Sequence, residues 1–217
     1  MKKYLILFLV FLSIFIALIS VTYFKRVPME SQQGLNSNKH PGHGRIVMLG
    51  NSVTFRTDWR ILLNRNDVLN RGINGNTTGD MLKRLNAIID MKPEYCFIMG
   101  GINDIFLGFS LNEIFENYVE IIKLLNDSGI RTVIQSTLYV SGALPDSDEI
   151  NVQVGRLNQN LKEFSGKNAI PFIDLNRTMS KNHRLFSDYT VDGVHLSKKG
   201  YETWSQILIP FIKKLSS

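Results

Sequence analysis

The chain of 217 residues has a single cysteine, Cys96, which excludes an intrachain disulfide and any multi-cysteine zinc or iron–sulfur site. Cys96 falls inside a short apolar run, so we expect it to be a small core residue. No GxxxxGK[ST] loop is present and no GxGxxG opens a helix, so no phosphate loop, NAD site or other cofactor is indicated. Basic residues are spread among acidic ones without an aromatic-interleaved stripe, which argues against nucleic-acid binding.

The net charge of +6 comes mostly from the N-terminus, where two basic residues stand on each side of a run without any charge. This run, residues 4–24, is almost wholly apolar and has about the 20 residues that a membrane crossing needs. Cleaved signals have shorter apolar cores and small-residue cleavage sites, so residues 1–26 are predicted as a transmembrane anchor. A cleaved signal, giving a secreted protein, and a buried core helix are the alternatives.

The segment after the anchor, residues 27–44, is polar, rich in Gly, Asn, Ser and Pro, and without periodicity. It is interpreted as a flexible linker, in which His40 and His43 are solvated and do not form a metal site. Residues 45–217 then form one domain. The basic residues flanking residues 4–24 favour the extracytoplasmic side for this domain only slightly.

Short apolar runs alternate with helical periods throughout this domain, which predicts an α/β fold. The runs are short enough to be strands covered on both faces. Strands alternating with helices indicate a parallel sheet between two helical layers, with any ligand bound beyond the carboxyl ends of the strands. The five predicted strands are residues 45–49, 68–71, 95–99, 132–136 and 170–174.

Four longer helices are predicted between and after these strands, at residues 78–90, 111–126, 151–164 and 197–215, besides a short one near 58–63. Ser110 with Glu113 is a capping box before the second, and Gly129 suits a left-handed cap at its end. Thr77 and Asp80 are typical of an N-terminal cap before the helix at 78–90. Pro210 is expected to kink or split the last helix.

Polar residues that suit acyl transfer follow three of the strands and recur near the C-terminus. Ser52 comes directly after the first strand and is a candidate nucleophile. His195 is the best-placed base, and Asp192, three residues earlier, can orient it. Backbone N–H groups and an Asn amide can stabilise an oxyanion, which points to Gly75 and Asn103.

These residues stand in the order of the four sequence blocks of the SGNH hydrolases, or GDSL esterases/lipases, and the chain resembles that family from about Ile46 to His195. The resemblance implies a flavodoxin-like three-layer α/β/α sandwich with a five-stranded parallel sheet in the order 2-1-3-4-5. It also implies a metal-free Ser52–His195–Asp192 triad and an oxyanion hole made by the Ser52 N–H, the Gly75 N–H and the Asn103 amide. Gly75 is preferred to Gly72 because it precedes Asn76-Thr77-Thr78.

The sequence departs from the family at Asn51, where an aspartate is usual. Asparagine keeps the size and one acceptor oxygen but loses the charge. His183 and Asp188 are a rival base and carboxylate, at a spacing that matches no block. Asp104 is interpreted as a cap or loop brace.

The predicted function is hydrolysis of short acyl esters, O-acetyl groups on carbohydrate above all, by a membrane-tethered enzyme. Residues 105–109 could form a small apolar wall for the acyl group, and the loop 138–150, with Tyr139 and Ser141, could contact a polar leaving group. The alternatives are a lysophospholipase or thioesterase, a glycan O-acetyltransferase, and a non-catalytic binding protein on the same fold. The sequence leaves the oligomeric state open.

Overall fold

A computed structural model describes residues 45–215. The predicted anchor at residues 4–24 and the linker at 27–44 lie outside the described residues. Within residues 45–215, no helix combines the length and the apolar character that a membrane crossing needs.

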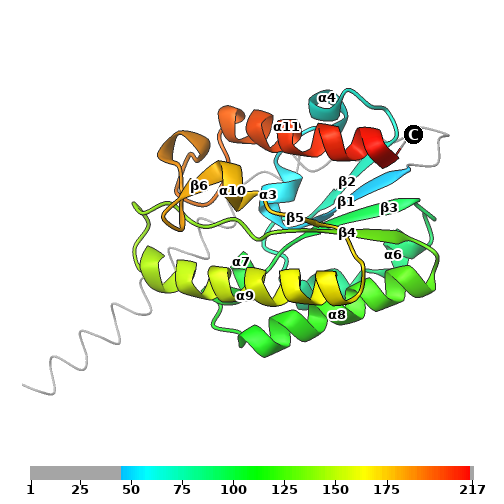
Figure 1. The fold of residues 1–217 in the computed structure, drawn as a ribbon, viewed down its shortest axis with the longest axis horizontal. Coiled ribbons are helices and arrows are strands. Elements are labelled where there is room, and N and C mark those ends of the chain that lie inside the picture. Colours follow the sequence, from blue (N-terminus) through cyan, green and yellow to red (C-terminus); the bar gives the residue numbers. More distant parts are fainter. Residues whose placement is uncertain (1–44, 216–217) are drawn as a thin grey trace, which may run out of the picture. The chain divides into compact units, whose positions relative to one another are not determined.

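Five parallel strands form the central sheet, in the order β2-β1-β3-β4-β5 (Figure 1). Both the parallel α/β fold and this order confirm the prediction. Gly50, at the end of β1, pairs with Gly72 on β2 and Met99 on β3, so these three strands end at the same level. The strands are β1 (Ile46–Gly50), β2 (Val68–Gly72), β3 (Tyr95–Met99), β4 (Arg131–Gln135) and β5 (Phe172–Ile173).

Helices cover both faces of the sheet, as Figure 1 shows. One face carries α5 (Thr78–Lys83), α6 (Asn86–Ile89), α7 (Ile102–Phe106), α8 (Leu111–Asp127) and α9 (Ser147–Lys167). The other carries α3 (Ser52–Phe55), α4 (Trp59–Leu63), α10 (Asn176–Met179) and α11 (Lys198–Leu215). Smaller elements follow α10: strands β6 (Ser180–Lys181) and β7 (Arg184–Leu185), and the 3-10 helix η1 (Ser187–Tyr189).

Alternate residues of the central strands supply two separate apolar cores. Val47 and Leu49 of β1 pack in the core under α5–α9, whereas Ile46 and Met48 pack in the core under α4 and α11. Because successive side chains of a strand point to opposite faces, a strand in the middle layer must be apolar throughout. Cys96 is fully buried in the first core, as expected.

Several predicted boundaries were wrong. The helix predicted at 78–90 is two helices, α5 and α6, which are separated by Arg84 and Leu85. The apolar spacing does not reveal the break between the two helices, because the same core contains Met81, Leu85 and Ile88 from both sides of it. The loop predicted at 138–150 is shorter, because α9 begins at Ser147, and the fifth strand keeps only two residues.

Pro210 does not split α11, which runs unbroken from Lys198 to Leu215. A proline inside a helix removes one backbone hydrogen bond and costs about 3 kcal/mol. Leu208 and Ile212, buried on either side of Pro210, hold both halves against the same core. Thr77 and Asp80 form a capping box, and Gly129 has φ 77°, as predicted. Ser110 caps α8 by accepting the Glu113 N–H, which is one half of the capping box predicted there.

Candidate active site

The candidate nucleophile, Ser52, is the first residue of α3 and lies directly beyond the end of β1. Asn51 is the N-cap of this helix, and its Oδ1 accepts the Val53 N–H at 3.0 Å. A side chain at Gly50 would place its Cβ 2.7 Å from the Met99 carbonyl oxygen, so only glycine fits the turn. The N–H of Ser52 belongs to the first turn of α3, where helical backbone N–H groups have no partner within the helix.

Ser52, His195 and Asp192 form one line of hydrogen bonds. The Oγ of Ser52 lies 3.0 Å from Nε2 of His195, and Nδ1 of His195 lies 2.6 Å from Oδ2 of Asp192. Asp192 fixes the tautomer, because a carboxylate accepts the Nδ1–H and leaves Nε2 free to accept the serine proton. Ser52 is 6% exposed, whereas the His195 side chain is 20% exposed, so the line opens to solvent at the histidine and its carboxylate.

The loop that carries Asp192 and His195 is held by its own backbone. Oδ1 of Asp192 accepts the N–H of Val194 at 3.0 Å and the N–H of His195 at 2.7 Å. Partial burial raises the pKa of Asp192, but the bonds from the His195 ring and from these two N–H groups outweigh burial, so the pKa lies below its ordinary value. Asp192 is therefore an anion at neutral pH, as an orienting carboxylate must be.

The oxyanion candidates Gly75 and Asn103 come from the loops after β2 and β3. Gly75 is exposed, has φ 75°, and has open space where a Cβ would stand. Nδ2 of Asn103 donates to the carbonyl oxygen of Asn76 at 2.9 Å, which joins the two loops. The Ile73 N–H donates to the Gly50 carbonyl oxygen at 3.1 Å, which joins the Gly75 loop to the serine turn.

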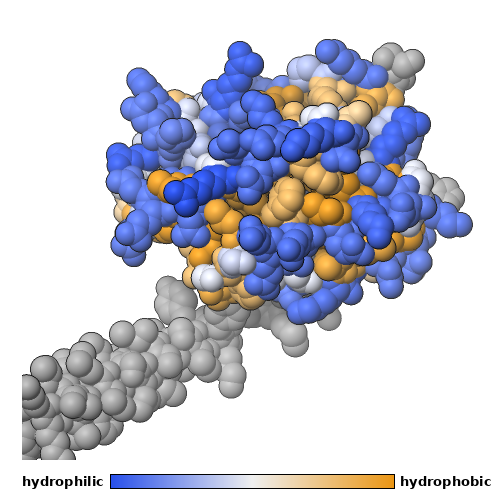
Figure 2. All heavy atoms as spheres, turned by 60° about the horizontal axis from the view of Figure 1, so that its bottom comes forward, coloured by the Kyte–Doolittle hydropathy of each residue, from blue (hydrophilic) through white to orange (hydrophobic). Residues whose placement is uncertain are grey.

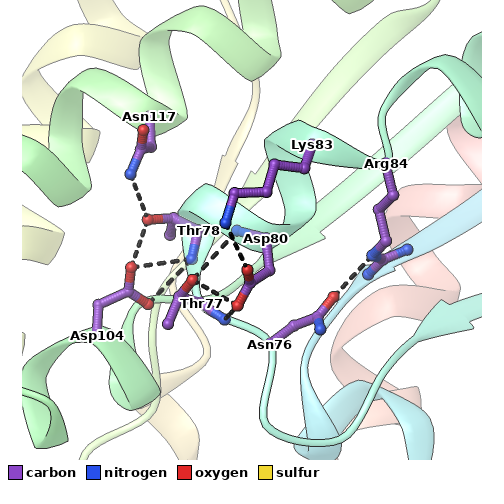
Figure 3. A network of polar contacts seen from close by, with 8 residues as sticks. All are labelled: Asn76, Thr77, Thr78, Asp80, Lys83, Arg84, Asp104 and Asn117. Atoms are coloured by element: carbon purple, nitrogen blue, oxygen red, sulfur yellow. Dashed lines mark hydrogen bonds and ion pairs between the residues drawn. The ribbon is translucent and has the colours of Figure 1, made fainter.

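Asp104 braces these loops, as its interpretation from sequence predicted (Figure 3). Its buried carboxylate accepts the Thr78 N–H at 2.9 Å and the Thr78 hydroxyl at 2.5 Å. Asn117 of α8 donates to the same hydroxyl at 3.1 Å. Burial raises the pKa of Asp104, and the bonds from Thr78 only partly offset this.

Sequence reasoning missed two polar residues beside the site, Arg84 and Asn76. Nε of Arg84 donates to Oδ1 of Asn76 at 2.7 Å, and both side chains are drawn in Figure 3. Arg84 lies within an apolar helical pattern, between the exposed residues Lys83 and Asn86, and no local motif marks it. Only its depth in the fold distinguishes it from a surface arginine.

The rival residues are not brought to Ser52. His183 packs edge-on against Tyr139, with ring centroids 5.4 Å apart, and Asp188 pairs with Lys199 at 3.0 Å. Ser141, predicted to contact the leaving group, is buried, and its Oγ accepts the Ala143 N–H, so this contact stays a prediction. No cluster of three or more potential metal ligands occurs in the part of the chain that the structure describes.

Comparison with known sequences gives a family match and distant relatives. The model of the GDSL-like Lipase/Acylhydrolase family matches residues 48–203. The N-acylneuraminate cytidylyltransferase of Streptococcus agalactiae serotype V is 28% identical over 172 residues, covering 78% of this chain and 40% of that protein. The chain thus spans about 40% of the length of the curated relatives it matches.

Solved structures resemble the fold over most of its length. A proposed acylhydrolase from Bacteroides fragilis is 27% identical, with a TM-score of 0.73 over 88% of this chain and 97% of that one. The lipase/acylhydrolase from Enterococcus faecalis is 25% identical, with a TM-score of 0.64 over 78% of this chain and 95% of that one.

Proposed function

Since the chain belongs to the GDSL-like lipase/acylhydrolase family and is an SGNH-type ester hydrolase, we propose that it removes short acyl groups, acetyl above all, from carbohydrate. The observation that carries the mechanism is the hydrogen-bonded line from Ser52 through His195 to Asp192. Ser52, His195 and Asp192 are the proposed triad.

In the first half of the reaction, Oγ of Ser52 attacks the ester carbonyl carbon while Nε2 of His195 takes the hydroxyl proton. Asp192 stabilises the imidazolium that forms. The negative charge on the former carbonyl oxygen is bound by the N–H groups of Ser52 and Gly75 and by the Asn103 amide. Collapse of this intermediate breaks the ester bond, and His195 returns its proton to the departing alcohol.

In the second half, water replaces the alcohol. His195 takes a proton from water as the oxygen attacks the acyl-Ser52 carbonyl carbon, and the same donors bind the second oxyanion. Expulsion of Ser52 releases the carboxylic acid and restores the serine hydroxyl with the proton held on His195.

The surface beside Asn103 supports a short acyl group. Leu107 and Phe109 follow α7 and are 67% and 37% exposed, with Phe106 at 43%. Figure 2 shows apolar surface exposed among hydrophilic side chains on the side that bears α8 and α9. Such side chains can shelter an acetyl or butyryl group at an open surface, but they do not enclose a long chain.

Two further observations support a carbohydrate ester. The Streptococcus agalactiae relatives are named for N-acylneuraminate, a sugar, although the matched segment is only 40% of their length. Their cytidylyl transfer is not carried over, because the triad performs acyl transfer. The apolar run at residues 4–24, interpreted as an anchor, would hold the domain outside the cytoplasm among cell-envelope glycans.

A lysophospholipase or thioesterase is the second candidate, favoured by the apolar run at residues 4–24, interpreted as a membrane anchor. Chain-length preference separates the two. The test measures hydrolysis of p-nitrophenyl acetate, butyrate and palmitate by the full-length chain, with Ser52→Ala as the blank. Ser52-dependent turnover that falls with chain length supports the short-chain esterase, and turnover that rises contradicts it. Acetate release from O-acetylated sugars then tests the carbohydrate.

A further inference from the structure

Arg84 is a half-buried arginine whose hydrogen bonds, among residues 45–215, all go to neutral oxygens. Its Nη2 donates to the carbonyl oxygens of Gly50, at 3.0 Å, and Arg71, at 2.9 Å, and its Nε donates to Oδ1 of Asn76. Burial lowers the pKa of its guanidinium to about 10. A cation that is partly removed from water and hydrogen-bonded only to neutral oxygens adds little to the stability of the fold, so stability alone is a poor reason for an arginine here.

The acceptors of Arg84 are the segments that meet at the candidate oxyanion hole. Gly50 ends β1 and precedes Asn51 and Ser52, and Arg71 lies on β2 just before the Gly75 loop. Asn76 follows Gly75 directly. One planar guanidinium therefore spans the serine turn and the oxyanion loop, a geometry that suits arginine and that a lysine cannot reproduce.

Asn76 passes this restraint to Asn103. Its side-chain oxygen accepts from Arg84, and its main-chain oxygen accepts from Nδ2 of Asn103 at 2.9 Å. An amide nitrogen carries two hydrogens, so the bond to Asn76 leaves the second for a substrate oxygen. The position of Asn76 thus sets both the direction of the Asn103 amide and the placement of the adjoining Gly75 N–H.

Asp104 restrains the opposite end of the same loop. Its bonds go to Thr78, at the start of α5, whereas Arg84 bonds to Asn76 (Figure 3) and to the Gly50 carbonyl oxygen. The Gly75–Asn76 turn lies before the residue that Asp104 holds. Restraint of Thr78 therefore does not by itself fix the Gly75 N–H relative to Ser52.

We propose that Arg84 is a positioning residue of the oxyanion hole, which acts through Asn76 to hold the Gly75 N–H and the Asn103 amide against the Ser52 turn. Arg84 does not touch the substrate. This inference rests on the proposed ester hydrolysis. Misplacement of catalytic groups by about 1 Å can cost on the order of 100-fold in rate, so loosening this loop should lower kcat.

The test compares Asn76→Ala and Arg84→Lys in the full-length protein, with p-nitrophenyl acetate as substrate. Asn76→Ala removes the acceptor of Arg84 and keeps the main-chain oxygen that Asn103 needs. Each variant should lower kcat by about 10- to 100-fold and leave KM within about twofold, because the loop acts on the transition state. Asn74→Ala, an exposed asparagine in the same loop, is the matched control and should retain wild-type kcat.

A double-mutant cycle with Asn103→Ala separates positioning from general support of the fold. In the Asn103→Ala background, the fold-decrease in kcat caused by Asn76→Ala should be at least about threefold smaller than in the wild type, because one of the positioned donors is gone. An equal fold-decrease in kcat in both backgrounds, or an unchanged kcat in Asn76→Ala, would overturn the proposal. If Arg84→Lys does not fold, the Asn76→Ala cycle alone decides.

The wild-type measurement distinguishes this inference from the proposed function. Absence of Ser52-dependent turnover in the wild type would overturn ester hydrolysis, and the role of Arg84 with it. Ser52-dependent turnover in the wild type, together with wild-type kcat in Asn76→Ala, would overturn the role of Arg84 alone.

Discussion

The Nε2 atom of His195 lies 3.0 Å from Oγ of Ser52, although the two residues are 143 positions apart in the chain. A second link ties the same segments together, because the Tyr201 hydroxyl of α11 donates to the Val53 carbonyl oxygen of α3 at 2.8 Å. Tyr201 is buried and packs edge-on against Trp59. The C-terminal segment is thus docked on the serine turn by a core contact close to the proposed triad.

Loss of either triad partner should abolish turnover. Ser52→Ala removes the nucleophile and His195→Ala the base, and each should lower kcat/KM by at least about 1,000-fold because such residues act as a unit. Hydrolysis of p-nitrophenyl acetate by each purified variant measures this. His183→Ala is the matched control, since His183 packs on Tyr139 and should be dispensable. Retained activity in Ser52→Ala would contradict the triad.

The side chain of Asn103 should matter in the transition state. Asn103→Ala removes one oxyanion donor, so kcat should fall by about 10²–10³ with little change in KM. Asn168→Ala, which removes an exposed bond to the Phe164 carbonyl oxygen at the end of α9, should leave kcat unchanged. Steady-state kinetics of both variants decide the point, and a neutral Asn103→Ala would show that this amide is not an oxyanion donor.

Asn51 should serve as a brace of the serine turn. Its Oδ1 caps α3, while its buried Nδ2 has no hydrogen-bond partner among residues 45–215. Asn51→Ala should cost about 1–2 kcal/mol of unfolding free energy, the usual loss for an N-cap. Asn51→Asp keeps the capping oxygen, so kcat should stay within about tenfold of the wild type.

Urea unfolding and ester hydrolysis of the two variants provide these measurements. A rise in kcat well beyond tenfold in Asn51→Asp would contradict a bracing role and indicate that the missing charge limits the native site.

Acid should weaken the fold through Asp67. The bond from Arg65 lowers the pKa of Asp67 below its ordinary value of 3.8, although burial opposes this. A carboxyl with a lowered folded pKa contributes stability above pH 3.8 and loses it as pH falls through the folded pKa. Asp67→Asn should therefore lower stability at pH 7, by up to about 1 kcal/mol for a partly exposed pair, and less at pH 2–3.

The measurement is the urea midpoint of Asp67→Asn and wild type at pH 7 and at pH 2.5. Glu113→Gln is the control, because no ion pair of that side chain occurs in the part of the chain that the structure describes. Equal destabilisation of Asp67→Asn at both pH values would rule out the ion-pair explanation.

Local pattern was enough to predict the sheet and the positions of the polar blocks. Strands such as Ile46–Gly50 and Tyr95–Met99 are buried on both faces, and a strand buried on both faces is recognisable in the sequence as a continuous apolar run. Strand ends then place Ser52, Gly75 and Asn103 at one edge of the sheet, because parallel strands end together. Helix caps were equally visible, since a cap needs only residues three apart.

The sequence by itself therefore determined the α/β class, the sheet edge that bears the polar blocks, and the spacing that joins Asp192 to His195. Only the tertiary structure decided that α5 and α6 separate, that Ser141 is buried, and that Arg84 reaches Gly50 and Asn76. The reason is the range of the interactions. Caps and apolar periods depend on neighbours a few residues away, whereas the bond from Arg84 to Gly50 joins segments 34 positions apart, through a side chain whose surroundings no local pattern records.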